Sequence, residues 1–279
     1  MAEITPADVA KLRAMTNAGF LQCKKALVEA NGDLNAAVDI LRKKGIASAD
    51  TKSGRAANEG VIVQNIQPGA RAGILVEVNC ETDFVARNED FRGFCEAVGR
   101  KLLENPEADL EVMRTEQVAK MGENIQIARR HKFEVSGNGM VAAYIHTGSK
   151  IGVLVEVGAG VEATVGHDEF KQLVRDITLQ IAAAHPYVVA RDQVPQEKLD
   201  KEREIATEQA KGKPPQAVAK IVEGKLEKFF QSYCLLDQGF VKQNSEVTVK
   251  EHISALAKKL NDEILIRRFV RFQVGESQG

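Results

Sequence analysis

The stretch GVIVQNIQPGARAGILVEV at residues 60–78 recurs 79 positions later as GMVAAYIHTGSKIGVLVEV at residues 139–157. The two stretches align without a gap, and eight of their 19 positions are identical. Each contains a strand-like apolar run, a turn with glycine and a second apolar run, which is the pattern of a β-hairpin. A repeat at a fixed offset indicates a duplicated structural unit. The chain therefore contains the same hairpin twice.

The repeat continues past the hairpin into a helix and a third strand. Four apolar positions recur at helical spacing in both copies: Phe91/Phe170, Phe94/Leu173, Val98/Ile177 and Leu102/Ile181. Residues 125–135 then match residues 264–274 at an offset of 139, which predicts a closing strand in each copy. We expect an α+β fold with two related subdomains, each containing an antiparallel three-stranded sheet.

The hairpin and helix of the two copies are 79 positions apart, whereas their last strands are 139 positions apart. The second copy therefore contains about 60 additional residues before its last strand. Residues 194–233 of this insertion carry apolar side chains at helical spacing, and KGKPP at 211–215 forms a turn between them. We predict an inserted antiparallel helical hairpin. The sequence leaves open whether this hairpin projects from its domain or lies on it.

Residues 1–45 predict a head of three short helices. Thr5 and Asp8 have the spacing of a capping box, and Asn17-Ala18-Gly19 should break the first helix. Asp33 should cap the third helix, which is expected to end at the basic run 42–44. The apolar stripe of the first helix should face inward, and it comprises Val9, Leu12 and Met15.

Small and polar residues at 46–59 predict a linker between this head and the first hairpin. The expected domains follow in chain order: a head at 1–45, a linker at 46–59, a first α+β subdomain at 60–138, a second at 139–193 and 234–279, and the inserted hairpin at 194–233.

Composition and charge exclude several function classes. The chain has 38 Lys and Arg residues against 39 Asp and Glu residues, so it lacks the basic excess of a general binder of nucleic acid or anionic membranes. No apolar run approaches the ~18 residues of a membrane-spanning helix. The N-terminus also lacks the apolar segment of a secretory signal. We expect a cytoplasmic protein.

Motifs for covalent chemistry are absent from the sequence. The four cysteines include no C-x-x-C pair, and the five histidines have no metal-ligand spacing. The sequence also has no G-x-S-x-G, no G-x-x-x-x-G-K-[ST] and no G-x-G-x-x-G. We therefore expect reduced, structural cysteines, with a redox or nucleophilic cysteine as the alternative. We also expect no catalytic residue, no metal site and no cofactor.

The two copies differ in the loop between the second strand and the helix. The first copy has TDFVARN at 82–88 where the second has VEATVGH at 161–167, so Phe84 corresponds to Ala163. Asn88 can cap the following helix, but capping does not explain Phe84. Phe84 either packs into its own core or is an exposed aromatic of a binding site, and the residues leave both interpretations open.

Several motifs together resemble the elongation factor Ts family of bacteria. The motif TDFVARN is preceded by EVNCE, and the head carries CKKAL and NGD, which are similar to the family's ubiquitin-associated-type helical head. The resemblance covers residues 1–274 in the family's order. Its motifs are EVNCE at 77–81, TDFVARN at 82–88, CKKAL at 23–27, NGD at 31–33, GRAANEG at 54–60 and IGVLVEV at 151–157.

This resemblance implies a translation elongation factor that acts in protein biosynthesis as a guanine nucleotide exchange factor. Its implied partner is elongation factor Tu, which would itself bind the nucleotide and the magnesium. The resemblance implies no covalent chemistry, no nucleic-acid contact and no membrane contact for this chain. Phe84 would displace the magnesium and phosphate side of the partner's nucleotide site, and Asp83 would orient the loop. The implied exchange loop comprises Thr82, Asp83, Phe84 and Val85.

The resemblance also implies partner contacts outside this loop. They are Phe20, Leu21 and Lys24 in the head, then Met121 with Gly122, and His146 in the second hairpin. Phe20 and Leu21 equally suit the core of the head, and His146 equally suits an exposed turn.

A second function class uses the head alone. An adaptor that binds ubiquitin-like proteins through the helical head is the alternative hypothesis. It leaves the asymmetric loop of residues 82–88 without a purpose.

Overall fold

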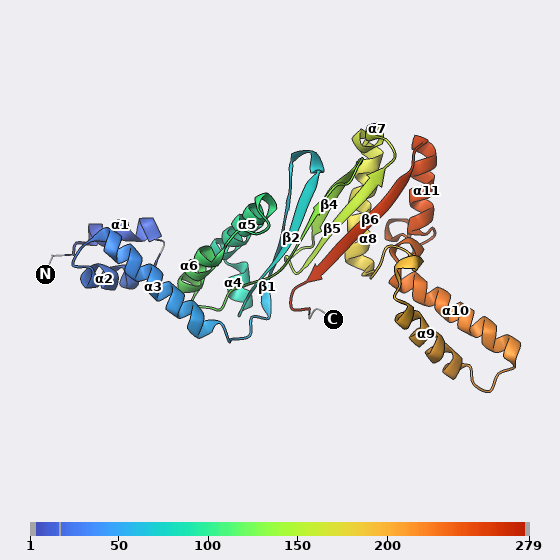
Figure 1. The fold of residues 1–279 in the computed structure, drawn as a ribbon, viewed down its shortest axis with the longest axis horizontal. Coiled ribbons are helices and arrows are strands. Elements are labelled where there is room, and N and C mark those ends of the chain that lie inside the picture. Colours follow the sequence, from blue (N-terminus) through green and yellow to red (C-terminus); the bar gives the residue numbers. More distant parts are fainter. Residues whose placement is uncertain (1–3, 17, 277–279) are drawn as a thin grey trace. The chain divides into compact units, whose positions relative to one another are not determined.

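The computed structural model describes residues 4–16 and 18–276 (Figure 1). The chain divides into two compact units. The first comprises Met1–Val63, Val76–Arg130 and Gln273–Gly279, and the second comprises Gln64–Leu75 and His131–Phe272. Ala18 and Gly19 of the expected helix break lie between the first two helices, which end at Thr16 and begin at Phe20. Asn17 of that break, and the ends of the expected domains at 1–3 and 277–279, lie outside the described residues.

The head consists of α1 (Pro6–Thr16), α2 (Phe20–Glu29) and α3 (Leu34–Lys52). The Thr5 hydroxyl and the Asp8 carboxylate cap α1 as expected, with Asp8 N donating to Thr5 Oγ1 at 3.3 Å. Asp33 caps α3 by accepting hydrogen bonds from two backbone N–H groups. The core of the head is small and continuous, and its buried members are Val9, Leu12, Cys23, Ala26, Leu27 and Ala37.

Two expectations for the head are wrong. Met15 is exposed rather than part of the head's core, because it lines a groove between the head and α6 (Glu111–Met121). The third helix does not end at residue 44, so residues 46–52 of the expected linker are helical. Gly45 and Ala49 are buried one turn apart, and a Cβ at Gly45 would lie 3.6 Å from Ala119 Cβ in α6. Packing of these small residues stabilises the helix where local signals predict its end.

The two copies have the same order of elements, which confirms the α+β fold. The first copy contains β1 (Glu59–Ile66), β2 (Ala72–Cys80), α4 (Asp83–Arg87), α5 (Glu89–Glu104), α6 and β3 (Gln126–Glu134). The second contains β4 (Gly139–Ile145), β5 (Ile151–Ala159), α7 (Glu162–Gly166), α8 (Asp168–Ala184), α11 (Val249–Leu260) and β6 (Ile264–Gln273). The sheets have the orders β1-β2-β3 and β4-β5-β6. β4 and β5 pair antiparallel from Gly139↔Gly158 to Ile145↔Gly152.

Each copy buries the apolar face that the repeat predicts. All eight shared positions on α5 and α8 are buried. In the second unit this face packs with Val153, Val155 and Val157 of β5, which alternate along one face of the strand. The hydrophobic effect therefore selects the same helix-on-sheet packing in both copies.

The glycine that begins each repeat is required by a close backbone approach. Gly60 and Gly139 both have φ near 149°, where side chains are rarely tolerated. A Cβ at Gly60 would lie 2.3 Å from Val78 O, and one at Gly139 would lie 2.4 Å from Val157 O. The identity of this position in the two copies is thus a steric requirement.

The shared glutamate of each repeat forms a buried ion pair with an arginine of the third strand. Glu77 pairs with Arg129 in the first copy. In the second copy Glu156 Oε2 lies 2.7 Å from Arg268 Nε, and Glu156 Oε1 lies 2.9 Å from Arg267 Nη1. Because these carboxylates are almost completely buried, their charge needs such partners.

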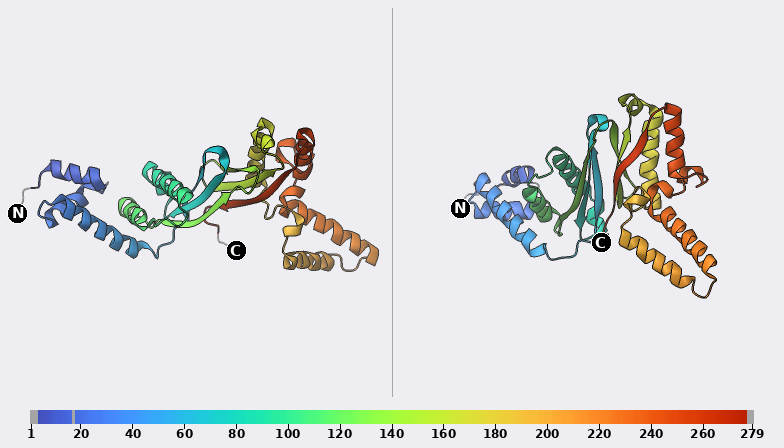
Figure 2. Two further views of the ribbon diagram at one scale, coloured as in Figure 1. Left: turned by 45° about the horizontal axis from the view of Figure 1, so that its top comes forward. Right: turned by 45° about the vertical axis from the view of Figure 1, so that its right-hand side comes forward.

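The insertion forms an antiparallel pair of helices, α9 (Gln196–Gln209) and α10 (Pro215–Tyr233), which lie side by side in both views of Figure 2. No residue of α10 is buried. At the base of the hairpin the Arg191 guanidinium binds Glu227 at 2.7 Å and Asp237 at 2.6 Å. The Tyr187 ring stacks on the Tyr233 ring with centroids 4.6 Å apart.

Candidate partner-binding loop and surrounding contacts

The predicted exchange loop forms a short helix whose second residue points into solvent. β2 ends at Cys80, and Thr82 is the N-cap of α4, with its hydroxyl accepting from Val85 N. Asn88 caps α5 as expected, so α4 is held at both ends. The Phe84 side chain is 82% exposed, which rules out the alternative that it packs into its own core. An aromatic side chain displayed on a loop that a rigid scaffold holds is suited to contact with a partner.

The loop carries its own ion pair. The Asp83 carboxylate lies 3.0 Å from Arg87 Nη2, one helical turn away. Asp83 and Val85 are half-buried, whereas Arg87 is exposed. The arrangement places Phe84 at the most accessible point of α4, with charged neighbours at its base.

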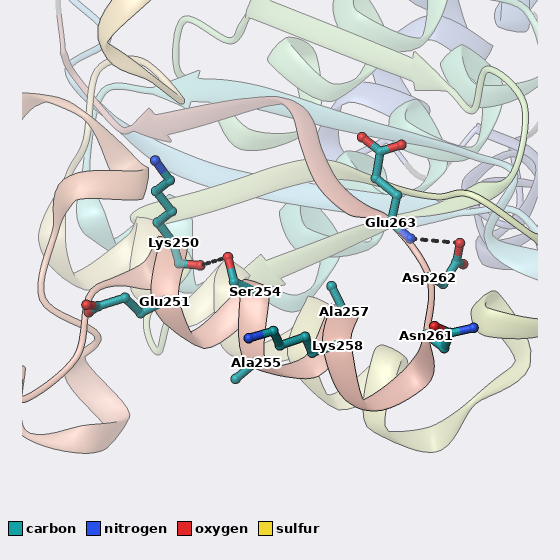
Figure 3. A pocket seen from close by; sticks show the side chains of 9 residues that line it. All are labelled: Lys250, Glu251, Ser254, Ala255, Ala257, Lys258, Asn261, Asp262 and Glu263. Atoms are coloured by element: carbon teal, nitrogen blue, oxygen red, sulfur yellow. Dashed lines mark hydrogen bonds between the residues drawn. The ribbon is translucent and has the colours of Figure 1, made fainter.

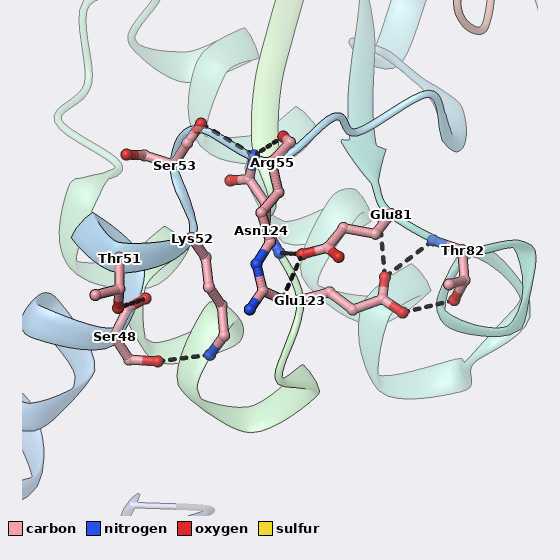
Figure 4. A network of polar contacts seen from close by, with 9 residues as sticks. All are labelled: Ser48, Thr51, Lys52, Ser53, Arg55, Glu81, Thr82, Glu123 and Asn124. Atoms are coloured by element: carbon pink, nitrogen blue, oxygen red, sulfur yellow. Dashed lines mark hydrogen bonds and ion pairs between the residues drawn. The ribbon is translucent and has the colours of Figure 1, made fainter.

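A carboxylate from another part of the chain braces the loop (Figure 4). Glu123 Oε2 accepts hydrogen bonds from Glu81 N at 3.0 Å and Thr82 N at 3.1 Å, and Glu123 Oε1 accepts one from the Thr82 hydroxyl at 2.6 Å. Charge-assisted hydrogen bonds of this kind are among the stronger ones in proteins. The site residues predicted from the sequence do not include Glu123. A signal was present, because the second copy has another acidic residue, Asp262, at the matching position 139 residues later.

Met121 and Gly122 directly precede this brace. Gly122 ends α6 in the left-handed conformation with φ of 77°, and it is exposed. Met121 is half-buried. The chain connection to Glu123 therefore brings these two predicted contacts into the neighbourhood of the exchange loop.

The predicted head residues lie on the outer surface of α2. Phe20 is 50% exposed and Leu21 is 69% exposed, and Lys24 is also exposed. The alternative that Phe20 and Leu21 form the core of the head is therefore wrong. The core of the head instead receives Cys23, Ala26 and Leu27 from α2.

His146 belongs to the second unit and follows β4. It is exposed, and its Nδ1 lies 3.0 Å from the Tyr144 hydroxyl. Both side chains line a cavity of about 320 Å³, together with Ile151, Leu179 and Phe240. An exposed imidazole at the edge of an apolar cavity is suited to a polar contact beside an apolar one.

Groups suited to covalent or metal chemistry do not gather in the described part of the chain. All four cysteines are buried. Burial raises the pKa of the Cys234 thiol to about 11, and burial also raises the pKa of the Cys95 thiol, so neither forms a thiolate readily. Among the described residues, no group of three His, Cys, Asp or Glu side chains could hold a metal ion.

A further pocket lies over α11 and the turn after it, and none of the sequence-predicted site residues lines it (Figure 3). Its walls are charged and small side chains, including Lys250, Lys258 and Asp262. None of the described helices has the length and apolar character needed to cross a membrane.

Comparison with known proteins agrees with this architecture. A sequence model of the family described as "Elongation factor TS" matches residues 81–276. The chain is 45% identical to "Elongation factor Ts" of Symbiobacterium thermophilum, over 99% of this chain and 93% of that protein. It is 44% identical to "Elongation factor Ts" of Chloroherpeton thalassium, over 99% of this chain and 100% of that protein.

The duplicated fold and these matches define a translation elongation factor. The chain belongs to the elongation factor Ts family.

Proposed function

We propose that this chain binds elongation factor Tu in the cytoplasm and promotes release of GDP and its exchange for GTP. The action is non-covalent, and the partner binds the nucleotide and the magnesium. Membership of the elongation factor Ts family supports this proposal. The single observation that carries it is the 82% exposure of Phe84 on a helix braced at its N-terminus.

The mechanism follows from linkage between two binding events. A GTPase holds its nucleotide through magnesium and through backbone N–H groups that cradle the phosphates. Contacts made only when those groups are displaced weaken nucleotide binding, and returning nucleotide weakens the exchange factor by the same factor. Burying a Phe side chain contributes roughly 1.5–3 kcal/mol. Since ~1.4 kcal/mol corresponds to a factor of ten, Phe84 alone can change nucleotide affinity substantially.

The remaining predicted residues support this displacement. Thr82 and Val85 fix the helix that carries Phe84, and Asp83 offers a carboxylate to displaced groups of the partner. Phe20, Leu21 and Lys24 contact a helix of the partner's GTP-binding domain. Met121 with Gly122, and His146, add contacts outside the exchange loop.

The expected domains have separate roles in partner binding and nucleotide exchange. The head at 1–45 docks on the partner, and the first subdomain at 60–138 carries the exchange loop. The second subdomain, at 139–193 and 234–279, carries His146 and the hairpin at 194–233. Residues 46–59 join the head to the first subdomain.

The adaptor hypothesis receives no support from these features. A ubiquitin-like-binding adaptor needs only the head, whereas Phe84 and the family match at 81–276 lie outside it. Release of a fluorescent GDP analogue from elongation factor Tu tests the proposal. Catalytic amounts of this chain should accelerate release, and an unchanged rate would reject the function.

A further inference from the structure

The segment between α3 and β1 is fastened to the first subdomain by side chains. Asn124 Nδ2 donates hydrogen bonds to Ser53 O at 3.3 Å and to Arg55 O at 2.8 Å (Figure 4). Asn124 is only 1% exposed, so this amide is directed into the interior. A segment that composition predicts as a free linker is therefore bound along its backbone.

Two further side chains fasten the same segment. Asn79 Nδ2 donates to Ala57 O at 3.2 Å, and Asn79 is 7% exposed. The Glu81 carboxylate lies 3.4 Å from Arg55 Nη1. Asn79, Glu81 and Asn124 together form what we call the linker clamp.

The linker clamp is specific to the first copy of the repeat. Its three positions correspond to Gly158, Gly160 and Glu263 in the second copy, none of which has an amide side chain. A duplicated fold keeps in both copies what folding of the unit requires. The clamp is thus an addition to the shared fold.

The brace of the short helix is, by contrast, common to both copies. Asp262 corresponds to Glu123, and its Oδ2 accepts a hydrogen bond from Val161 N at 3.1 Å, as Glu123 does from Thr82 N. Asp262 and Glu263 appear together beside α11 in Figure 3. A carboxylate thus holds this turn in both copies, whereas the linker clamp occurs only in the first copy.

The clamp and the exchange loop share their attachment points. Glu81 Oε1 accepts a hydrogen bond from Asn124 N at 2.6 Å, while Glu81 N donates to Glu123. Asn124 directly follows Glu123. The end of the head's long helix and the start of the exchange loop are therefore held by neighbouring residues of one hydrogen-bonded network.

We infer that Asn79, Glu81 and Asn124 are positioning residues that hold the head in one fixed geometry relative to Phe84. This inference rests on the proposed function, in which the head and the exchange loop contact the same partner. Two contact surfaces held at the correct spacing bind more tightly than two surfaces joined by a loose tether. The linker clamp thus makes the linker a fixed connection between the two contact surfaces.

Trypsin cleavage after Arg55 in the full chain tests the clamp without the partner. Proteolysis of a native protein follows the local opening of its backbone. Asn124→Ala and, separately, Asn79→Ala should be cut at Arg55 about ten-fold faster than wild type. Asn138→Ala is the matched control, because Asn138 Nδ2 donates to Gly160 O at 2.8 Å in the second copy. Equal cleavage of all four proteins would overturn the inference.

The concentration dependence of GDP release tests the positioning role. In both clamp variants the concentration of this chain that gives half-maximal release should rise about ten-fold, with a maximal rate within about two-fold of wild type. Two variants at separate positions guard against one of them failing to fold. Faster cleavage with unchanged half-maximal concentration would overturn the inference while leaving the proposed function intact. A wild-type chain that releases no GDP would reject the proposed function, and the positioning role with it.

Discussion

Phe84 and Ala163 occupy the same position in two copies of one structural unit, each as the second residue of a five-residue helix. Both positions are exposed to solvent. The shared fold therefore needs no large side chain here, and the aromatic ring of Phe84 contributes nothing to the common core. This asymmetry within a duplicated fold supports the proposed binding role of the loop in the first copy.

The exposed face of α2 provides a prediction for the head. Phe20→Ala with Leu21→Ala should raise the concentration for half-maximal GDP release about ten-fold, because two apolar contacts are lost. The free energy of unfolding, measured by thermal denaturation, should change by less than about 0.5 kcal/mol, since both side chains are exposed. Leu265→Ala, an exposed leucine outside the proposed contacts, is the control. Unchanged half-maximal concentration would remove the head from the binding surface.

The hairpin provides a second prediction. Replacing residues 203–225 with a short Gly/Ser loop should leave the second unit cooperatively folded, because Arg191, Glu227 and the Tyr187–Tyr233 stack at the base remain. Replacing all of 194–233 removes Glu227 and Tyr233 and should lower the melting temperature by several degrees. The two variants are compared by thermal unfolding. An equal loss in both would show that the distal helices stabilise the unit.

The buried carboxylate of Glu156 makes stability depend on pH. Burial alone raises its pKa, but hydrogen bonds from Arg267, Ser136 N and Arg268 outweigh burial and hold the pKa below the usual 4.5. The unfolded chain then binds the proton more tightly than the folded chain. The stabilisation is fully present above pH 4.5 and is lost as pH falls through the lower pKa of the folded state.

The substitution Glu156→Gln tests this pH dependence of stability. At pH 7 the variant should be less stable by about 3 kcal/mol, the lower end for breaking a buried pair, because both arginines remain partly exposed. The difference from wild type should shrink below pH 4.5. Denaturant unfolding at several pH values measures it. A constant difference across the whole range would contradict the assignment.

The internal repeat made the fold predictable from sequence, because two copies report independently on the same buried positions. Phe91 and Val98 of the first copy match Phe170 and Ile177 of the second. This agreement indicates that each unit packs the same face of its helix on its own sheet. The same comparison revealed the odd loop at Phe84. It did not decide whether Phe84 is buried, because exposure depends on tertiary packing.

Interactions between distant residues explain what the sequence did not predict. Residues 46–52 are helical because Gly45 and Ala49 pack on α6, which overrides a local signal for a helix end. The linker is bound by Asn124, 71 positions from Ser53, and no local pattern indicates that pairing. The role of Glu123 could have been predicted from the sequence, because Asp262 is an acidic residue at the matching position of the second copy.

Two control variants accompany the substitution of Phe84, one in the same loop and one at the matching position of the second copy. Asp83→Ala should slow GDP release in the same direction as Phe84→Ala but by less, because a partly solvated carboxylate contributes little. Ala163→Phe places an aromatic at the equivalent position of the second copy. It should not accelerate release, because the positions of the second copy that match the linker clamp are Gly158, Gly160 and Glu263.

The most direct test is the apparent second-order rate of GDP release from elongation factor Tu with Phe84→Ala, measured by stopped-flow fluorescence beside thermal unfolding of the variant. The account predicts a rate lowered about ten-fold or more, as for a truncated hot-spot aromatic. It also predicts stability within about 0.5 kcal/mol of wild type, since the ring is exposed. A stable variant whose rate stays within about three-fold of wild type, under ~1 kcal/mol of lost contact, would contradict it.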